Sequence, residues 1–172
     1  MDTNKTMNHK NLRIIIASDS HGHHELLKSI MEHEKRQAAL TGVSLVFLHA
    51  GDSSARYEDE LDGWLSVKGN MDFSDFLPFY RIIPVHKHKI FLTHGHLYSN
   101  NSILNIMEEN ACDICVTGHT HVPSIQNKNG KYFLNPGSVV RPRFASKRQY
   151  LSLDIEEDGN IKIKTKFIEE IF

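Results

Sequence analysis

Short apolar segments and amphipathic segments alternate along most of the chain. The apolar segments have the length and the β-branched content of strands, and we expect strands at 12–17, 43–49, 79–85, 90–93, 114–117, 132–134 and 150–155. Between them, apolar residues recur at helical spacing, which predicts helices at 24–36, 58–65 and 102–110. Because strands and helices alternate in the first half, that half is predicted to form a parallel sheet covered by helices.

The second half is richer in strands than in helices. Two polar segments there, "HKHK" at 86–89 and "EDGN" at 157–160, are typical of hairpin turns. The pair Cys112-x-x-Cys115 lies at a predicted strand, where a spacing of three puts two side chains on opposite faces. We therefore interpret both cysteines as core residues rather than as a redox or zinc pair.

Length and composition restrict the class of protein. The chain has 172 residues, 40% of them hydrophobic, which suffices for a proper core, and we expect one domain at 11–172 after a disordered tail at 1–10. Its 20 basic and 21 acidic residues give a formal charge of −1, so charge gives no reason to expect sequence-independent binding to nucleic acid or membranes. No segment approaches the roughly 18 apolar residues of a membrane span, and the polar start is unlike a signal peptide, so we expect a cytoplasmic location.

Histidine is unusually frequent, with 12 residues, and many of them follow predicted strands. The chain reads "SDSHGH" after the first strand, "AGDSS" after the second, "GNMD" after the second helix, and "THGH" and "TGHTH" after two later strands. Because ligands bind outside the carboxyl ends of the strands in open α/β sheets, we expect these segments to converge. The polar side chains that they supply include Asp19, His21, Asp52, Asn70, Asp72, His94, His96, His119 and His121.

Oxygen and nitrogen donors without a thiolate are typical of a site for Mn²⁺, Fe, Zn²⁺ or Ni²⁺ rather than of a zinc finger. Two carboxylates, an amide and four imidazoles exceed one tetrahedral site, and they fit two ions about 3.5–4 Å apart that share a carboxylate. Each motif alone has an ordinary explanation: a helix cap, a Gly-Asp turn, or two histidines on one strand face. Five such motifs in this order, most of them at a strand exit and each beside a glycine, favour a metal site.

The order "DSH…GD…GNMD…HGH…GHTH" resembles the pattern of the calcineurin-like metallophosphoesterases, and the short length and "LNPGS" at 134–138 resemble their small bacterial and archaeal phosphodiesterase branch. The resemblance implies an α/β fold of two stacked mixed β-sheets flanked by helices, in four layers (αββα). It also implies a dinuclear metal site, with Mn²⁺ as the expected ion and Ni²⁺, Zn²⁺, Fe and Mg²⁺ as alternatives. By motif position, one ion would be held by Asp19, His21 and His121 and the other by Asn70, His94 and His119, with Asp52 bridging the two.

The implied activity is hydrolysis of a small-molecule phosphate ester, foremost a phosphodiester, by attack of a metal-bridging hydroxide without a covalent enzyme intermediate. Candidate catalytic residues are Asn70, Asp72 and His96, of which Asp72 and His96 are expected to orient the imidazoles. Asn70 and Arg141 are candidates for contact with the substrate phosphate, although a salt bridge in a solvated loop is an equal alternative for Arg141.

One position departs from the pattern of the family. The broad family has Gly-Asn-His-Glu/Asp where this chain has Gly69-Asn70-Met71-Asp72. That histidine is usually taken as the acid that protonates the leaving oxygen, and Met71 cannot donate a proton. The small phosphodiesterase branch often lacks the histidine too, so the departure indicates a subfamily, with His23 and His96 as the substitutes to consider.

Two other classes of protein remain open. A non-catalytic scaffold like the retromer subunit of this fold has a degraded metal set, whereas all seven ligand positions here hold competent residues. A metallo-β-lactamase-like hydrolase also uses His-x-His, but it leads with a His-rich motif rather than with Asp-x-His. The sequence does not determine the natural substrate, the native metal or whether the chain forms a homo-oligomer.

Overall fold

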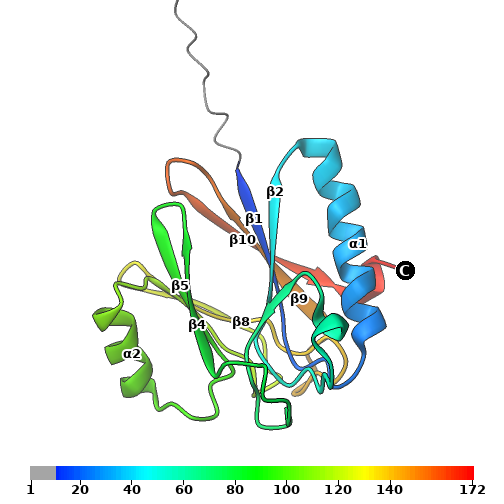
Figure 1. Ribbon diagram of the computed structural model, residues 1–172. Helices are drawn as coiled ribbons and strands as arrows, with labels where there is room; N and C mark the ends of the chain where they lie inside the picture. Colours follow the sequence, from blue (N-terminus) through cyan, green and yellow to red (C-terminus); the bar gives the residue numbers. More distant parts are fainter. Residues whose placement is uncertain (1–10) are drawn as a thin grey trace, which may run out of the picture.

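The computed structural model describes residues 11–172, and the tail expected at 1–10 lies outside the described residues. Two mixed five-stranded sheets are stacked on each other (Figure 1). The first has the order β10-β9-β1-β2-β3, with β1 at Leu12–Ala17, β2 at Ser44–His49, β3 at Trp64–Ser66, β9 at Gln149–Ile155 and β10 at Ile161–Phe167. The second has the order β4-β5-β6-β8-β7, with β4 at Tyr80–Val85, β5 at His88–Thr93, β6 at Ile114–Val116, β7 at Ser124–Lys128 and β8 at Lys131–Asn135. This arrangement confirms the expected α/β class.

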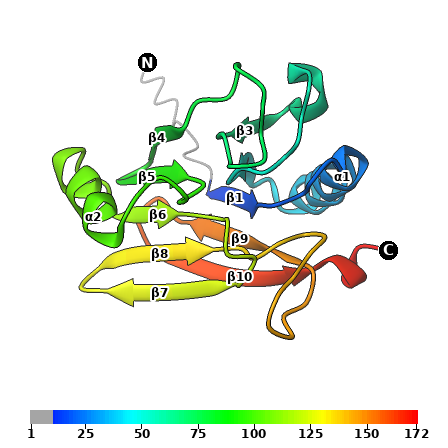
Figure 2. The ribbon, with the colours of Figure 1, turned by 90° about the horizontal axis from the view of Figure 1, so that it is seen from below.

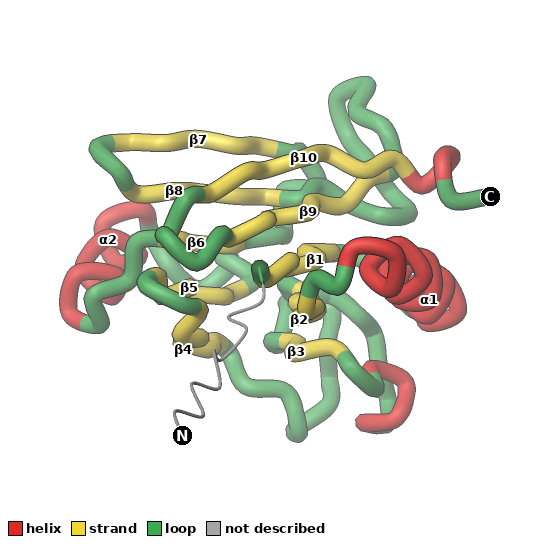
Figure 3. Tube along the Cα trace, turned by 90° about the horizontal axis from the view of Figure 1, so that it is seen from above, coloured by secondary structure: helices red, strands yellow, loops and turns green. Residues whose placement is uncertain are grey.

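Two α-helices, α1 at His24–Thr41 and α2 at Asn100–Glu109, lie on opposite sides of the stacked sheets (Figures 2 and 3). The hydroxyl of Ser99 caps α2 by accepting the N–H of Ser102 at 3.1 Å. Two 3₁₀ turns complete the described elements, η1 at Glu58–Leu61 and η2 at Ile168–Glu170.

Side chains alternate between the two faces of each strand, so each sheet contributes to two apolar cores. Ile14 and Ile16 of β1 pack between the sheets, whereas Ile15 between them packs in the cluster under α1. On the other sheet, Phe91 and Cys115 pack with the buried side chains of α2. The result is the expected order of four layers, helix, sheet, sheet and helix. A run that is apolar on both faces, such as 12–17, is therefore a strand that is buried on both sides.

The parallel strands determine where the polar segments gather. Strands β1, β2 and β3 run parallel in the first sheet, as do β5, β6 and β8 in the second. Their carboxyl ends lead into the loops at the lower edge of the molecule in Figure 1, while the β4–β5 hairpin turn lies at the opposite edge. Every expected metal-binding motif follows one of these six strands, and this places the motifs at one edge of the fold.

The segment 58–65 does not form the expected helix. Its first half is the short 3₁₀ turn η1, and Trp64 begins β3, which pairs in parallel with β2. Gly63 has a φ of 82°, a left-handed conformation that interrupts the helical path. Trp64 is buried, and its ring lies 5.2 Å from that of Phe47, centroid to centroid. Burial of this large side chain against β2 outweighs the local helical pattern.

The sequence assigned no range to β7 or β10. β7 is a polar edge strand, "SIQNK", with little of the apolar pattern that marks a strand. β10 follows the expected "EDGN" turn and alternates apolar residues with lysines. Apart from β3, the other strands lie within two residues of their expected bounds, and α1 extends to Thr41. The two cysteines are buried and free, as expected. Among the described residues, no helix is long and apolar enough to cross a membrane.

Candidate metal centre

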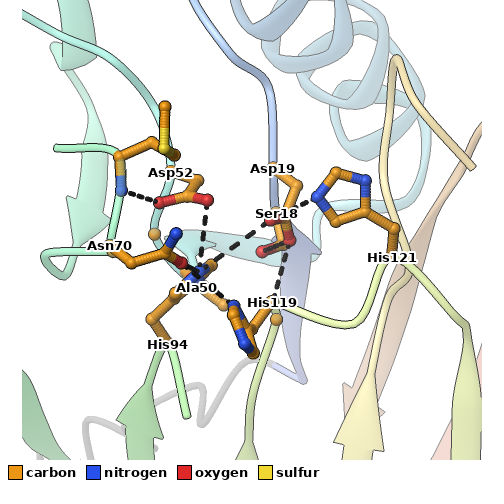
Figure 4. A network of polar contacts seen from close by, with 12 residues as sticks. Ser18, Asp19, Ala50, Asp52, Asn70, His94, His119 and His121 are labelled. Atoms are coloured by element: carbon orange, nitrogen blue, oxygen red, sulfur yellow. Dashed lines mark hydrogen bonds and ion pairs between the residues drawn. The ribbon is translucent and has the colours of Figure 1, made fainter. Parts of the chain in front are cut away.

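Seven polar side chains from five loops converge at the lower edge of the sheets. Asp19 and His21 follow β1, Asp52 follows β2, and Asn70 follows β3. His94 follows β5, and the loop after β6 supplies His119 and His121. Figure 4 shows six of these side chains directed toward one another. The structure thus brings together all seven residues that the sequence nominates as metal ligands.

The seven side chains form two groups that share Asp52. In the first group, candidate ligand atoms of Asp19, His21, Asp52 and His121 all lie within 4.8 Å of one another. In the second, the Oδ1 of Asn70 lies 3.0 Å from Nε2 of His94 and 3.0 Å from Nδ1 of His119. The Oδ2 of Asp52 lies 3.3 Å from Nε2 of His94 and so joins the second group to the first.

The backbone at these residues is unusual. Five of the seven have a positive φ between 42° and 67°, a conformation that non-glycine residues seldom adopt: Asp19, His21, Asp52, His119 and His121. Such residues are retained where the surrounding structure holds them, and they cluster at functional sites. The unusual backbone conformation thus falls on the same positions as the candidate ligands.

Backbone hydrogen bonds between the loops hold this conformation. The N–H of Asp19 donates to the carbonyl of Gly51 at 3.0 Å, and the N–H of His21 donates to the carbonyl of Asp52 at 2.9 Å. These bonds extend the β1–β2 pairing beyond the strands. Gly51 is required here, because a Cβ at this position would lie 2.7 Å from Nδ1 of His94.

The "NPGS" segment positions two of the ligand loops, a role that the sequence did not reveal. The side-chain amide of Asn135 donates to the carbonyl of Gly118 at 2.8 Å, and the hydroxyl of Ser138 donates to the carbonyl of Asp19 at 2.8 Å. Both side chains are buried. The sequence feature that could have indicated this role is the presence of two polar residues at the end of β8, beside Pro136 and Gly137.

His49, at the end of β2, is a second residue whose role was missed. Its ring is fully buried, with Nε2 2.9 Å from the hydroxyl of Ser20 and Nδ1 accepting the N–H of Gly51 at 3.3 Å. Burial lowers the pKa of His49 to about 3, so the ring is neutral. A neutral imidazole thus connects the loop of Asp19 and His21 with the loop of Asp52.

Asp72 was expected to orient an imidazole, but its hydrogen bonds go elsewhere. Its carboxylate accepts the N–H groups of Asp52 and Gly69, each at 2.8 Å, and also that of Ser54. Asp72 therefore fixes the loop of Asp52 against the loop of Asn70 rather than an imidazole. The expectation failed because backbone N–H groups, which the sequence does not place, are its nearest donors.

His96 and Arg141 lie at the margin of the site. The ring centroid of His96 is 5.3 Å from that of His94, and its Nδ1 is buried without a hydrogen-bond partner among the described residues. His96 therefore packs beside the imidazole of His94 and, against expectation, makes no hydrogen bond within the described part of the chain that would orient that imidazole. Arg141 is exposed, and its carbonyl accepts Nδ1–H of His121 at 2.7 Å.

The electrostatics of the site centre on Asp52 and His94. Burial alone lowers the pKa of His94, but the hydrogen bond to Asp52 and the charge of Asp19 outweigh it and raise that pKa. Burial alone raises the pKa of the Asp52 carboxyl, but the hydrogen bond and charge of His94, together with the N–H of Met71, outweigh burial and lower that pKa. Burial lowers the pKa of His21 and of His119, which favours the neutral form of each ring, whose free lone pair can bind a cation.

The donor atoms fit a cation. The Nδ1–H of His94 donates to the carbonyl of Ala50 at 2.6 Å, so a neutral His94 presents the lone pair of Nε2 to the oxygens of Asn70 and Asp52. His121 likewise points Nε2 at Oδ1 of Asp19, 3.0 Å away, and that oxygen is buried without a hydrogen bond among the described residues. Lone pairs that face one another repel unless a proton or a metal ion lies between them.

A comparison with protein families decides the identity of the fold. The family model of the calcineurin-like phosphoesterase superfamily domain matches residues 12–158. The chain belongs to this superfamily. The match covers the loops after β1, β2, β3, β5 and β6, which carry the seven side chains, so the expected resemblance is confirmed.

Relatives of similar length support this assignment. The chain is 32% identical over 153 residues to the probable metallophosphoesterase YsnB of Bacillus subtilis, covering 86% of this chain and 87% of the relative. It is 28% identical over 165 residues to the phosphodiesterase YfcE of Escherichia coli K12, covering 83% of this chain and 88% of YfcE.

Solved structures show the same fold. A predicted phosphoesterase from Streptococcus pneumoniae superimposes with a TM-score of 0.78 at 32% identity, covering 92% of this chain and 91% of the other. Vps29 from Entamoeba histolytica, solved as a complex with Zn²⁺, superimposes with a TM-score of 0.66 at 22% identity, covering 91% and 99%. At that identity the likeness to Vps29 concerns the fold alone.

Proposed function

We propose that this protein is a metal-dependent phosphodiesterase with a dinuclear centre. One observation carries the proposal: two groups of donor atoms share the carboxylate of Asp52. In the proposed assignment, Asp19, His21 and His121 hold one divalent ion, Asn70, His94 and His119 hold the other, and Asp52 bridges them. When bound, two such ions would lower the pKa of a shared water and stabilise the charge that develops on phosphoryl oxygens.

The side chains of the site then have separate tasks. The imidazole rings would supply lone pairs to the ions, and carbonyl groups fix the orientation of two rings, as Ala50 does for His94 and Arg141 does for His121. Asp72 holds the loops of Asp52 and Asn70 at a fixed spacing through the N–H groups of Asp52 and Gly69. Asn70 is exposed at the surface of the site, where a substrate phosphate would meet it.

The donor set favours Mn²⁺ as the ion. Carboxylate, amide and imidazole ligands without a thiolate suit Mn²⁺, Fe, Zn²⁺ and Ni²⁺, and carboxylate and carbonyl oxygens shift the preference toward Mn²⁺. Both cysteines are buried in the core under α2 and do not compete for the ion. We therefore propose Mn²⁺ first, with Ni²⁺, Zn²⁺, Fe and Mg²⁺ as alternatives.

The experiment starts with protein that has been treated with chelator and then loaded with Mn²⁺, Ni²⁺, Mg²⁺ or Zn²⁺. Hydrolysis of bis(p-nitrophenyl) phosphate is compared with that of p-nitrophenyl phosphate, which has the same leaving group but is a monoester. The proposal expects no hydrolysis in chelator, recovery with Mn²⁺ and a preference for the diester. Full activity in excess chelator would exclude metal catalysis, and a preference for the monoester would exclude phosphodiesterase specificity.

A protein-binding scaffold of the same fold is the alternative function. It predicts a protein that binds metal at this site and hydrolyses neither ester. The retention of all seven donors and the strained backbone at five of them support the enzyme, because a binding surface alone needs neither.

A further inference from the structure

A cavity of about 870 Å³ adjoins the candidate metal centre. Its walls come from α2, from the β7–β8 hairpin and from the segment that contains Arg143 and Phe144. His119 and Thr117 belong to its lining, so the cavity shares a wall with the second group of donors. A volume of this size falls within the roughly 300–1,000 Å³ typical of small-molecule sites.

The cavity arises because α2 covers only part of its sheet. The helix packs over Phe91 of β5 and Cys115 of β6, whereas β7 is an edge strand that lies beyond β8. Phe133 of β8 packs against the α2 cluster yet stays partly exposed, and it belongs to the lining of the cavity. The open space between helix and hairpin is thus a consequence of the strand order.

The lining combines an apolar surface with positive charge. Ile103 and Leu104 of α2 and Phe133 of β8 provide apolar contacts. Two cationic residues, Arg143 and Lys128, also line the cavity, and none of the described lining residues is acidic. The Nζ of Lys128 lies 5.9 Å from the centre of the Phe133 ring. An apolar cavity with cations and without carboxylates is complementary to an organic anion.

The position of Arg143 is tied to the metal centre. Its N–H donates to the carbonyl of His121 at 3.2 Å, so the segment that forms one wall is attached to a ligand loop. The next residue, Phe144, is 88% exposed and has a φ of 51°. An aromatic ring is therefore presented to solvent at the edge of the cavity by a strained backbone.

We propose that this cavity binds an aromatic ester group of the substrate while the phosphate lies at the donors beside His119. The inference deepens the proposed function and rests on it, because it names the substrate class as aryl or heteroaryl phosphate esters. The apolar lining and Phe133 would contact the ring, and Arg143 would face the phosphate charge. The side-chain amide of Gln126, also in the lining, would meet polar edges of a heteroaromatic ring.

The test uses three anions that are not hydrolysed: methyl-, phenyl- and 1-naphthylphosphonate. The dissociation constant of each is measured by calorimetry with the full chain loaded with Zn²⁺, and binding is located by NMR of the isoleucine and methionine methyl groups. We expect naphthylphosphonate to bind at least about tenfold more tightly than methylphosphonate, since apolar contacts discriminate at about this level. The methyl group of Ile103 should shift with the aryl ligands and not with methylphosphonate.

Substitution of the lining provides the second arm. Leu104→Arg places a charged chain in the cavity and should bring the naphthyl-to-methyl affinity ratio close to one. Ile125→Arg is the matched control, because Ile125 is 48% exposed on β7 and is absent from the described lining. It should leave the ratio unchanged. The methyl shifts of the wild type test the proposal independently of how either variant folds.

Two results would overturn the inference. One is equal affinity for all three phosphonates. The other is an aryl ligand that shifts the methyl group of Met71, which lines a separate cavity with Phe73, and leaves Ile103 unchanged. If either result is found while hydrolysis of bis(p-nitrophenyl) phosphate is intact, the proposed role of the cavity is rejected and the proposed phosphodiesterase function stands. If no metal supports hydrolysis, the proposed function is rejected, and so is the proposal that the cavity holds the aromatic group of a substrate.

Discussion

The Oδ2 of Asp52 lies 3.3 Å from Nε2 of His94, while Oδ1 of the same carboxylate accepts the N–H of Met71 at 2.8 Å. His94 has no other ring atom to offer, because its Nδ1–H donates to the carbonyl of Ala50. The carboxylate of Asp52 thus faces the second group of donors, and it also belongs to the group around Asp19. A substitution at Asp52 therefore tests both halves of the site at once.

Asp52→Ala should lose activity together with at least one metal ion. The wild type should bind two ions per chain at saturation, because the shared carboxylate makes the two groups of donors interdependent. Elemental analysis of saturated and desalted protein gives the stoichiometry, and hydrolysis of bis(p-nitrophenyl) phosphate gives the activity.

Asp75→Ala is the control for this substitution. The side chain of Asp75 is fully exposed and lies 3.7 Å from Lys68, so its removal should change neither the metal content nor the activity. Wild-type protein that holds no more than one ion at saturation would contradict the dinuclear assignment.

His119→Ala should reduce kcat for the diester by about 100-fold or more while the protein stays folded. The loss follows from the several kcal/mol of charge stabilisation that a correctly held ion supplies. His119 is exposed on its loop, so the melting temperature without metal should stay close to that of the wild type. His33→Ala on α1 should leave both quantities unchanged. An active His119→Ala variant would argue against a role for this ligand.

His88 should make stability depend on pH. Its Nδ1 lies 2.5 Å from Oδ2 of Asp113, and its Nε2 lies 2.7 Å from the carbonyl of Gly159 in the β9–β10 turn. Burial alone lowers the pKa of His88, but these two contacts outweigh it and raise that pKa above its ordinary value. A raised pKa means that the stabilisation is fully present below about pH 6.5 and is lost as the pH rises through the folded pKa.

The corresponding variant is His88→Gln. Its urea midpoint should fall below that of the wild type at pH 5.5, and the two midpoints should converge by pH 9. His86→Gln, at an exposed position in the β4–β5 turn two residues before His88, should follow the wild type throughout. A difference in urea midpoint between His88→Gln and the wild type that is the same at all pH values would mean that His88 stabilises the protein through packing rather than through protonation.

The sequence predicted those parts of the fold in which local pattern and tertiary burial agree. The run 12–17 is apolar on both faces because β1 is covered by a core on each side, so its bounds were predicted correctly. At 58–65 the local pattern and tertiary burial disagree, because burial of Trp64 against β2 stabilises the fold more than a helix at this segment would. The polar strand β7 pairs at the edge of its sheet, where half of the backbone groups need no partner.

In the site too, some residues could be predicted from the sequence and others could not. Candidate ligands such as His119 and His121 are recognisable because their chemistry is unusual at strand ends. Groups that position them are harder to find, because they act through backbone atoms. Ser138 binds the carbonyl of Asp19, and Asp72 binds the N–H of Gly69, and neither partner is visible in residue types. Contacts of this kind appear only when the loops are placed in space.

The last prediction concerns Met71, which stands where the pattern of the broad family has a histidine, the expected leaving-group acid. Its side chain is 48% exposed, and its N–H donates to Asp52, so the residue lies directly beside the proposed bridging carboxylate. Without an acid at this position, the rate of the wild type should fall steeply as the pKa of the leaving group rises. A Brønsted plot of kcat/KM over p-nitrophenyl, phenyl and alkyl diesters measures that slope.

Met71→His should restore an acid and help most where the leaving group is worst. The variant-to-wild-type ratio of kcat/KM should therefore rise from p-nitrophenyl to phenyl to alkyl diesters, below a ceiling of about 10²–10⁴-fold. The gain will be smaller than this ceiling if the new imidazole is not oriented, since Asp72 is already committed to backbone N–H groups.

Phe73→His, two residues further on and 85% exposed, adds an imidazole without placing it beside Asp52 and should give a flat ratio. A flat ratio for Met71→His as well, together with a shallow wild-type slope, would mean that another residue already donates the proton. His96 would be the first to test, because its ring lies 6.2 Å from that of His119.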